Sequence, residues 1–442
     1  MPKKPSRFNG NHSAILVTTG VVCLFVVAGG VLSYSVLPQF TATVYERSGE
    51  VIGGVFVSDE KKDTEKKSTV TLRPGVTHIH SREPLYAIYM SQCVVGTPTF
   101  RDSLVKLIED TSLNAVVIDI KDYTGKIAFP TEHPLLADSV SDACGARDME
   151  AFIKRLHEKD IYVIGRITVF QDPYYTSKHP ELAVQSASKG GPWKDYKGLA
   201  FIDVSSEQYW EYVVALSEEA YAIGFDELNY DYVRYPSDGP MSDAVYKNSN
   251  KAETLERFFQ YLHKHVSPIG VVMSADLFGM TTTNTDDLNI GQVLERALPY
   301  FDYIAPMVYP SHYPKGFLNL GNPNNDPYLV VHHSMKEAVR RTEATSTRVQ
   351  TLTGKPIMET VTVPATATTA TTTKEVATGL YTKEAFSKLK LRPWLQDFDY
   401  GKDYKPADIE AQIQATYDAG LTSWFFWDPA NRYENLKAVL SQ

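Results

Sequence analysis

The alternation of short β-rich runs with amphipathic stretches from Tyr86 onward is the feature that most constrains the fold of this chain. Runs rich in Val, Ile and Tyr predict strands, and stretches with apolar residues at helical spacing predict helices. Strands that alternate with helices are typical of parallel α/β architectures. The eight strands that we expect are Tyr86–Met90, Ala115–Ile120, Tyr162–Thr168, Glu227–Val233, Gly270–Ala275, Tyr303–Met307, Pro393–Gln396 and Ser423–Trp427.

Amphipathic stretches between these runs complete the pattern of a (β/α)8 TIM barrel, which we assign to residues 83–442. A doubly wound open sheet is the rival fold. It lacks support because no Gly-rich phosphate loop follows the first strand. The helices that we expect are Phe100–Asp110, Asp148–Lys159, Ser206–Ile223, Ala252–Val266, Gln292–Leu298 and Pro406–Ala419.

The first residues of the chain read as a membrane anchor rather than as part of the barrel. Residues 14–37 carry no charge, and a helix needs about 20 apolar residues to cross a bilayer. Lys3, Lys4 and Arg7 lie in the preceding tail, residues 1–13, and predict a cytoplasmic N-terminus. We therefore expect a single-pass signal anchor in the cell membrane with the barrel outside. Secretion after cleavage of a signal peptide is the alternative, because the order of basic and apolar residues suits it too.

Two segments outside the expected strands and helices have the composition of exposed chain. Residues 38–82 form a tether with a charge run at 58–68, which is typical of solvated segments. Residues 361–378 are rich in Thr, Ala and Val and read as a low-complexity insertion in the barrel domain, exposed or accepting O-glycans. We expect neither segment to carry chemistry.

Net charge and cysteine content exclude some classes of function. A formal charge of -9 argues against nucleic acid as a partner, because phosphate binding needs a basic surface. Cys23, Cys93 and Cys144 are too few for a disulfide framework or a Cys-based zinc site. A Cys93–Cys144 bridge is compatible with an extracellular barrel, but we expect two unrelated thiols.

The stretch Gly224–Gly239 concentrates charged residues in an expected strand that is otherwise aromatic and apolar. A buried strand tolerates such charges only where they are paired or face a working cavity. Parallel barrels place catalytic groups at the C-terminal ends of their strands. Asp231 lies nearest that end, whereas Asp226 and Glu227 enter at the other end and are expected to be structural.

Acidic and aromatic residues recur after six of the eight expected strands, which predicts a rim suited to carbohydrate. Tyr and Trp rings stack on the C–H faces of sugars, and polar side chains bond to sugar hydroxyls. A lone Asp after a strand is more often a loop or helix-capping residue, but the recurrence favours a site. The substrate-binding candidates are Asp119, Lys121, Asp122, Arg166, Arg234, Tyr309, His312, Trp394, Gln396, Asp397, Trp427 and Asp428.

Glycosidic cleavage requires one ionised and one protonated carboxyl group, and Asp231 and Asp276 are the catalytic candidates. Arg234 follows Asp231 closely enough to keep it ionised, although the two could form a purely structural ion pair. Asp276 follows the next strand beside Leu277 and Phe278, and apolar surroundings raise a carboxyl pKa as a general acid requires. A helix-capping role is the alternative for Asp276.

No metal or other cofactor is predicted. His312 and the pair His332 and His333 lack the HExxH or comparable spacing of a metal site. We interpret His312 as a hydrogen-bonding partner of substrate. An Asp-cluster metal hydrolase, such as a deacetylase or phosphodiesterase, is a third and less favoured reading.

The strand ends resemble a bacterial family of glycosyl hydrolases of unknown specificity. The resemblance covers most of 86–442, and its most specific part runs from Asp231 to Pro236. It implies a (β/α)8 fold distantly similar to the α-amylase group, in which the acid after strand four is commonly the nucleophile. That group would place Glu after strand five, where this chain has Asp276. The matching segments are Val116–Asp122, Gly165–Ile167, Gly224–Pro236, Ser274–Asp276, Pro306–Pro310 and Arg392–Gln396.

These observations predict a membrane-anchored glycoside hydrolase that acts on a cell-surface or extracellular polysaccharide or oligosaccharide through paired carboxylates. The alternative is a barrel of the cell envelope that binds glycan without cleaving it. The doubtful identity of Asp276 as the acid motivates this alternative.

Overall fold

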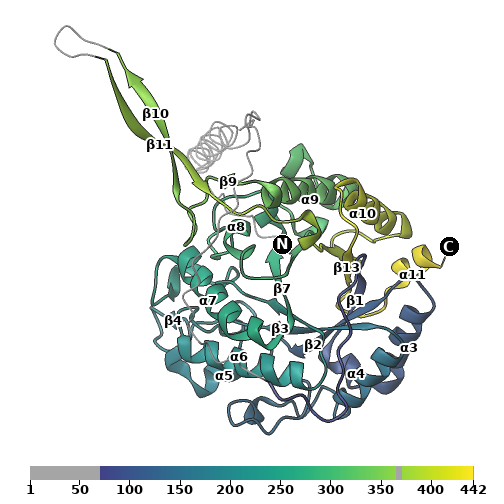
Figure 1. The fold of residues 1–442 in the computed structure, drawn as a ribbon. Coiled ribbons are helices and arrows are strands. Elements are labelled where there is room, and N and C mark those ends of the chain that lie inside the picture. The colour runs from purple at the N-terminus through teal and green to yellow at the C-terminus, as the bar shows by residue number, and fades with distance from the viewer. Residues whose placement is uncertain (1–69, 365–370, 442) are drawn as a thin grey trace, which may run out of the picture. The chain divides into compact units, whose positions relative to one another are not determined.

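The structure, a computed structural model, describes residues 70–364 and 371–441. Its centre is a closed barrel of eight parallel strands in the order β1-β13-β12-β8-β7-β5-β3-β2, which confirms the predicted TIM barrel (Figure 1). All eight expected strands are present. They are β1 Tyr86–Met90, β2 Ala115–Lys121, β3 Tyr162–Thr168, β5 Glu227–Asp231, β7 Val272–Phe278, β8 Tyr303–Met307, β12 Trp394–Gln396 and β13 Trp424–Trp427.

Helices surround the barrel, and all six predicted helices are present with small shifts at their ends (Figure 1). The sequence reading missed α9, because polar residues such as Ser334 and Arg341 share its buried face with Val330 and Met335. His332 and His333 lie half-buried on this helix. The helices are α2 Gln92–Val95, α3 Pro98–Glu109, α4 Met149–Glu158, α5 Pro173–Lys178, α6 Glu207–Ala222, α7 Lys251–Val266, α8 Leu294–Ala297, α9 Pro327–Glu343, α10 Pro406–Asp418 and α11 Glu434–Leu440.

The barrel core follows from the alternation of side chains along each strand. Tyr89, Ile164, Trp394 and Phe425 belong to one buried cluster, which fills the interior of the barrel. Their neighbours along the strands, such as Ile88, pack against the surrounding helices in a second cluster. The interior of the barrel is therefore packed with side chains.

The N-terminal end of the barrel is closed by paired charges. Glu227 forms a buried ion pair with Arg392 at 3.0 Å, and Arg392 also donates to the hydroxyl of Ser81. Asp226 accepts hydrogen bonds from the Ile79 amide and from His157. Residues 70–82, which lie within the predicted tether, thus contact the underside of the barrel.

Cys93 and Cys144 form a disulfide, so the expectation of two unrelated thiols is wrong. They are 51 residues apart in sequence, but their Cα atoms lie 4.5 Å apart. The segments that follow β1 and β2 are neighbours because these strands pair, and the Gly145 amide donates to the carbonyl of Gln92 at 3.0 Å. Strand order, which spacing in the sequence does not reveal, brings the thiols together.

Short strands and one long hairpin lie outside the barrel. The strands β10 and β11, which overlap both ends of the predicted insertion 361–378, form an exposed antiparallel hairpin that extends away from the barrel (Figure 1). It continues into a short pairing with β9, while β4 and β6 pair in the loops that follow β3 and β5. The bounds are β4 Gln185–Ser186, β6 Ala244–Val245, β9 Ser346–Thr347, β10 Pro356–Val363 and β11 Thr372–Thr382.

The predicted membrane anchor at 14–37 lies outside the described residues, as do the tail 1–13 and the tether as far as residue 69. Among residues 70–364 and 371–441, no helix has the length and apolar character that a membrane span requires.

Candidate active site

Arg166 joins two carboxylates at the C-terminal end of the barrel. Its strand β3 pairs with β2 and β5, in a register that sets Arg166 beside Asp119 and Thr168 beside Asp231. The Arg166 Nε donates to Asp231 Oδ2 at 3.0 Å, and Nη1 donates to Asp119 Oδ1 at 2.6 Å. Burial opposes the charge of Arg166, but its ion pairs with Asp231 and Asp119 raise its pKa well above the ordinary value. A fixed cation therefore lies among the acidic candidates.

Asp276 lies next to Asp231 on the neighbouring strand. Tyr230 pairs with Ala275, so the following residues, Asp231 and Asp276, come side by side. Asp276 Oδ1 accepts from Asn229 Nδ2 at 2.9 Å and from Trp394 Nε1 at 2.7 Å. Asp276 therefore accepts from two side chains and does not have the helix-capping role that was its alternative. Burial raises the pKa of Asp276 well above its ordinary value, and the charge of Asp231 adds to this shift.

The separation of the two carboxyl groups is bounded through Arg166. Its Nε lies 3.0 Å from Asp231 Oδ2 and 3.9 Å from Asp276 Oδ2, so these oxygens can be no further apart than the sum of the two distances. Retaining glycosidases separate their carboxyl groups by about 5–5.5 Å and inverting enzymes by about 6.5–9.5 Å. For these two oxygens the bound allows the retaining separation and only the lowest part of the inverting range.

Aromatic side chains surround the carboxylates. The rings of Tyr89 and Trp427 stack with centroids 3.9 Å apart, and Trp394 meets Trp427 edge-on at 5.8 Å. The hydroxyl of Tyr89 donates to Asp119 at 2.5 Å. Sequence reasoning missed Tyr89, although its inward-pointing place near the end of β1 was a usable signal. Trp427 is half-buried and is the aromatic of this group most open to a ligand.

Three further predicted residues lie on the rim beside this group. Tyr309 is buried, and burial together with the charges of Asp276 and Asp231 raises its pKa well above the ordinary value. Gln396 accepts a hydrogen bond from the hydroxyl of Ser311 at 2.8 Å. The neighbouring His312 is exposed and reaches the same aromatic surroundings.

Arg234 does not pair with Asp231, and this corrects the sequence-based assignment. Its guanidinium donates to the Ser237 hydroxyl at 2.8 Å and lies over the ring of Tyr232. Tyr232 has a φ of 49°, a left-handed conformation directly after the strand. The chain turns away there, and the cation that pairs with Asp231 is Arg166 on the neighbouring strand.

Four other substrate-binding candidates are bonded to neighbouring groups of the protein, and a direct contact with substrate stays a prediction for each. Burial raises the pKa of Asp397 to about 7. The recorded partners are the Thr168 carbonyl and Asp172 for Lys121, the Thr124 amide for Asp122, the Leu436 amide and Asn435 for Asp397, and the Ala430 and Arg432 amides for Asp428.

Within 70–364 and 371–441, no group of three or more His, Cys, Asp or Glu side chains is arranged to hold a metal ion. The cation among Asp119, Asp231 and Asp276 is instead the Arg166 guanidinium.

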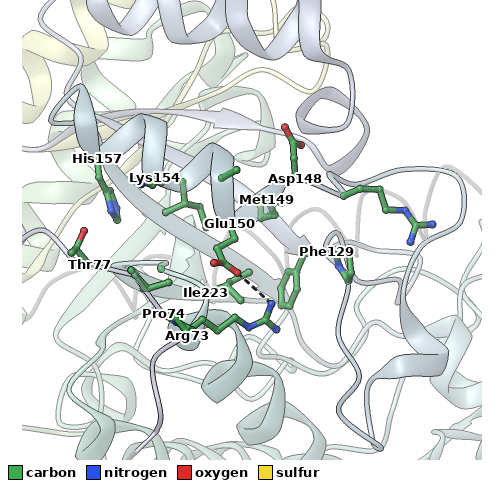
Figure 2. A pocket seen from close by; sticks show the side chains of 17 residues that line it. Arg73, Pro74, Thr77, Phe129, Asp148, Met149, Glu150, Lys154, His157 and Ile223 are labelled. Atoms are coloured by element: carbon green, nitrogen blue, oxygen red, sulfur yellow. Dashed lines mark hydrogen bonds and ion pairs between the residues drawn. The ribbon is translucent and has the colours of Figure 1, made fainter.

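A cavity of about 440 Å³ lies elsewhere, beside α4 and the segment that precedes β1 (Figure 2). Figure 2 shows Arg73 reaching across it to Glu150, at 3.4 Å. Its lining extends to His157 and to Gly224, which precedes β5, and includes none of the paired carboxylates. Because catalytic groups of parallel barrels lie at the C-terminal ends of the strands, we assign the chemistry to the end that carries Asp231 and Asp276.

A family model described as "putative glycosyl hydrolase domain" matches residues 87–353 and 355–433. The chain belongs to this family. Among curated proteins, none matches the chain. Membership places the chain among glycosyl hydrolases, as the resemblance of its strand ends implied.

Two solved structures have a similar fold over most of this chain, and a third matches a shorter part of it. The glycoside hydrolase domain of PgaB (BpsB) from Bordetella bronchiseptica is 12% identical, with 81% of this chain and 99% of that chain covered and a TM-score of 0.54. An α-L-fucosidase from Paenibacillus thiaminolyticus is 10% identical over 81% of this chain and 48% of its own, with a TM-score of 0.50. A hypothetical protein from Ruminiclostridium thermocellum is 32% identical over 43% of this chain and 96% of its own, with a TM-score of 0.39.

Proposed function

We propose that this glycosyl hydrolase cleaves its substrate with Asp231 as nucleophile and Asp276 as general acid. The observation that carries the proposal is the pairing of two adjacent carboxyl groups in unlike surroundings. Asp231 is ion-paired with the Arg166 guanidinium at 2.5 Å. Asp276 is fully buried beside that negative charge, which favours the protonated form.

The proposed reaction uses Asp276 and Asp231 in turn. Asp276 donates its proton to the glycosidic oxygen as the bond to the anomeric carbon breaks, and an oxygen of Asp231 bonds to that carbon. Asp276, now ionised, takes a proton from water. The oxygen of this water attacks the same carbon, the bond to Asp231 breaks, and the sugar leaves with retained configuration. Arg166 stabilises the carboxylate of Asp231 before and after the covalent step.

The substrate in this proposal is a cell-surface or extracellular polysaccharide, and the barrel lies outside the cell on a membrane anchor formed by residues 14–37. The Cys93–Cys144 disulfide supports an exported barrel, because such bonds persist in oxidising compartments. Secretion after signal cleavage would give the same barrel without the anchor. Membrane fractionation of cells that express the full chain separates the two, because only the anchored form sediments with the membranes.

Incubation of wild type, Asp231→Asn and Asp276→Asn with a panel of polysaccharides, followed by measurement of new reducing ends, tests the reaction. We expect the wild type to release reducing ends from at least one polymer and both variants to lose this activity. Equal release by all three proteins, or no release by any of them, would refute the proposal. Binding of a polymer without any product would favour the alternative, a glycan-binding barrel, to which the near-complete burial of Asp276 also points.

A further inference from the structure

Four aromatic rings form a row from the carboxyl pair to the solvent, across the loops that follow β8 and β12. Tyr309 begins this aromatic row, close enough to Asp276 for the charge of that residue to raise the Tyr309 pKa, after burial itself. Its ring centroid lies 5.6 Å from that of Phe398 and 5.5 Å from that of His312. The His312 ring lies 5.7 Å from that of Tyr400, which is 64% exposed and ends the row.

Buried polar side chains fix the backbone beneath the aromatic row. Gln396 accepts from the Ser311 hydroxyl and donates to the carbonyl of Phe398, both at 2.8 Å, and so ties the two loops together. Asn324, which is 3% exposed, donates to the carbonyl of Tyr400 at 2.7 Å. Because the backbone under these rings is already ordered, little conformational entropy is lost when a ligand binds them.

Packing alone accounts for the inner part of the aromatic row but not for its outer end. Tyr309 is buried and Phe398 half-buried, as expected of rings that join two loops. Tyr400 gains little from burial at 64% exposure, although its backbone is fixed. Although His312 is exposed, the protein around its ring lowers its pKa by desolvation, which favours the uncharged form. Flat, uncharged rings, of which Tyr309, His312 and Tyr400 also carry polar atoms, suit the apolar face and the hydroxyl edge of a sugar.

We propose that the aromatic row is a binding subsite for sugar rings away from the bond that is cut. The substrate is then a chain that runs from Asp231 and Asp276 across the β8–β12 edge of the barrel, rather than a single terminal sugar. The proposal rests on the assignment of that carboxyl pair as the cleavage site. It adds Phe398 and Tyr400 as residues that select for chain length.

Affinity electrophoresis tests the subsite without turnover. Protein carrying Asp231→Asn is run through native gels that contain amylose, glycol chitosan or pectate, which are a neutral, an amino-sugar and an acidic polymer. We expect one polymer to retard this parent protein, and Tyr400→Ala to weaken the binding by about three- to tenfold. The matched variant Tyr400→Phe keeps the ring and is expected to bind like the parent.

Equal retardation of Tyr400→Ala and its parent would overturn the subsite, as would a parent that none of the three polymers retards. If retardation depends on the Tyr400 ring but the wild type releases no reducing ends, the subsite is supported. The proposed hydrolase activity is then refuted. The two proposals therefore fail in different ways.

Discussion

The two ends of β5 carry buried carboxyl groups of opposite character. At its start, burial opposes the ionisation of Asp226, but hydrogen bonds from His157 and from backbone amides lower its pKa below the ordinary value. At its far end, Asp231 shares an arginine with Asp276, whose pKa is raised by burial and by that neighbouring charge. Burial is similar at both ends, so the donors and charges around each group separate a structural carboxylate from a candidate catalytic pair.

Replacing one carboxylate at each end of β5 tests the comparison with the largest expected effects. We expect Asp231→Asn to lower kcat by about 10⁴-fold, because a neutral amide cannot act as nucleophile or base. Asp226→Asn should leave kcat within about threefold and instead lower the free energy of unfolding by about 1–3 kcal/mol, through weakened buried hydrogen bonds. Kinetics and denaturant unfolding of both variants measure these effects. A loss of kcat in Asp226→Asn without a loss of stability would contradict the assignment of Asp226 as a structural carboxylate.

The acid at the C-terminal end gives the next largest effect. Asp276→Asn should lower kcat by about 10²–10³-fold. In the wild type the rate should fall as the pH rises through the raised pKa of Asp276, because the acid is active only when protonated. A substrate whose leaving group needs no proton should restore much of the activity of Asp276→Asn. The pH–rate profiles of wild type and variant measure both effects. A wild-type rate that rises on the alkaline side would rule out this role.

The disulfide braces only the C-terminal end, between the segments that follow β1 and β2. Replacing both Cys93 and Cys144 by Ser should lower the free energy of unfolding by about 4 kcal/mol, the chain-entropy value for a loop of 51 residues. The carboxyl pair lies on other strands, so kcat below the unfolding temperature should change little. Wild type treated with a reducing agent serves as the control and should match the double variant.

The pH dependence of stability should have opposite signs for the two ends. A lowered pKa means that Asp226 stabilises the fold above pH 3.8 and that this contribution is lost as the pH falls through the folded value. A raised pKa means that Asp276 begins to cost stability as the pH rises above 3.8. Relative to wild type, Asp226→Asn should therefore lose stability with rising pH and Asp276→Asn should gain it, each by at most about 1.4 kcal/mol per pH unit. Parallel trends in urea titrations at several pH values would contradict the comparison.

The barrel could be predicted because it depends on local periodicity, which each strand and helix carries in its own residues. The neighbours of Asp231 and Asp276 depend on strand order and register instead. Once a barrel is assumed, rim residues are expected to converge, and the structure does bring Asp119, Arg166 and Trp394 to this pair.

The hydrogen-bond or ion-pair partner of each rim residue could not be predicted from the sequence. Arg234 is close to Asp231 along the chain but turns away in space, whereas Arg166 lies a whole βα unit earlier and donates to it. The Cys93–Cys144 bond and the contact of Tyr89 with Asp119 likewise cross between strands. Proximity in sequence was the wrong guide at each of these places.

Trapping the covalent intermediate tests the central claim most directly. Wild type is incubated with 2-deoxy-2-fluoro glycosides that carry an activated leaving group, digested, and mapped by mass spectrometry. The account predicts a single glycosyl ester on Asp231 and no ester in Asp231→Asn. An ester on another carboxylate, or hydrolysis that inverts the anomeric configuration and leaves no ester, would contradict it.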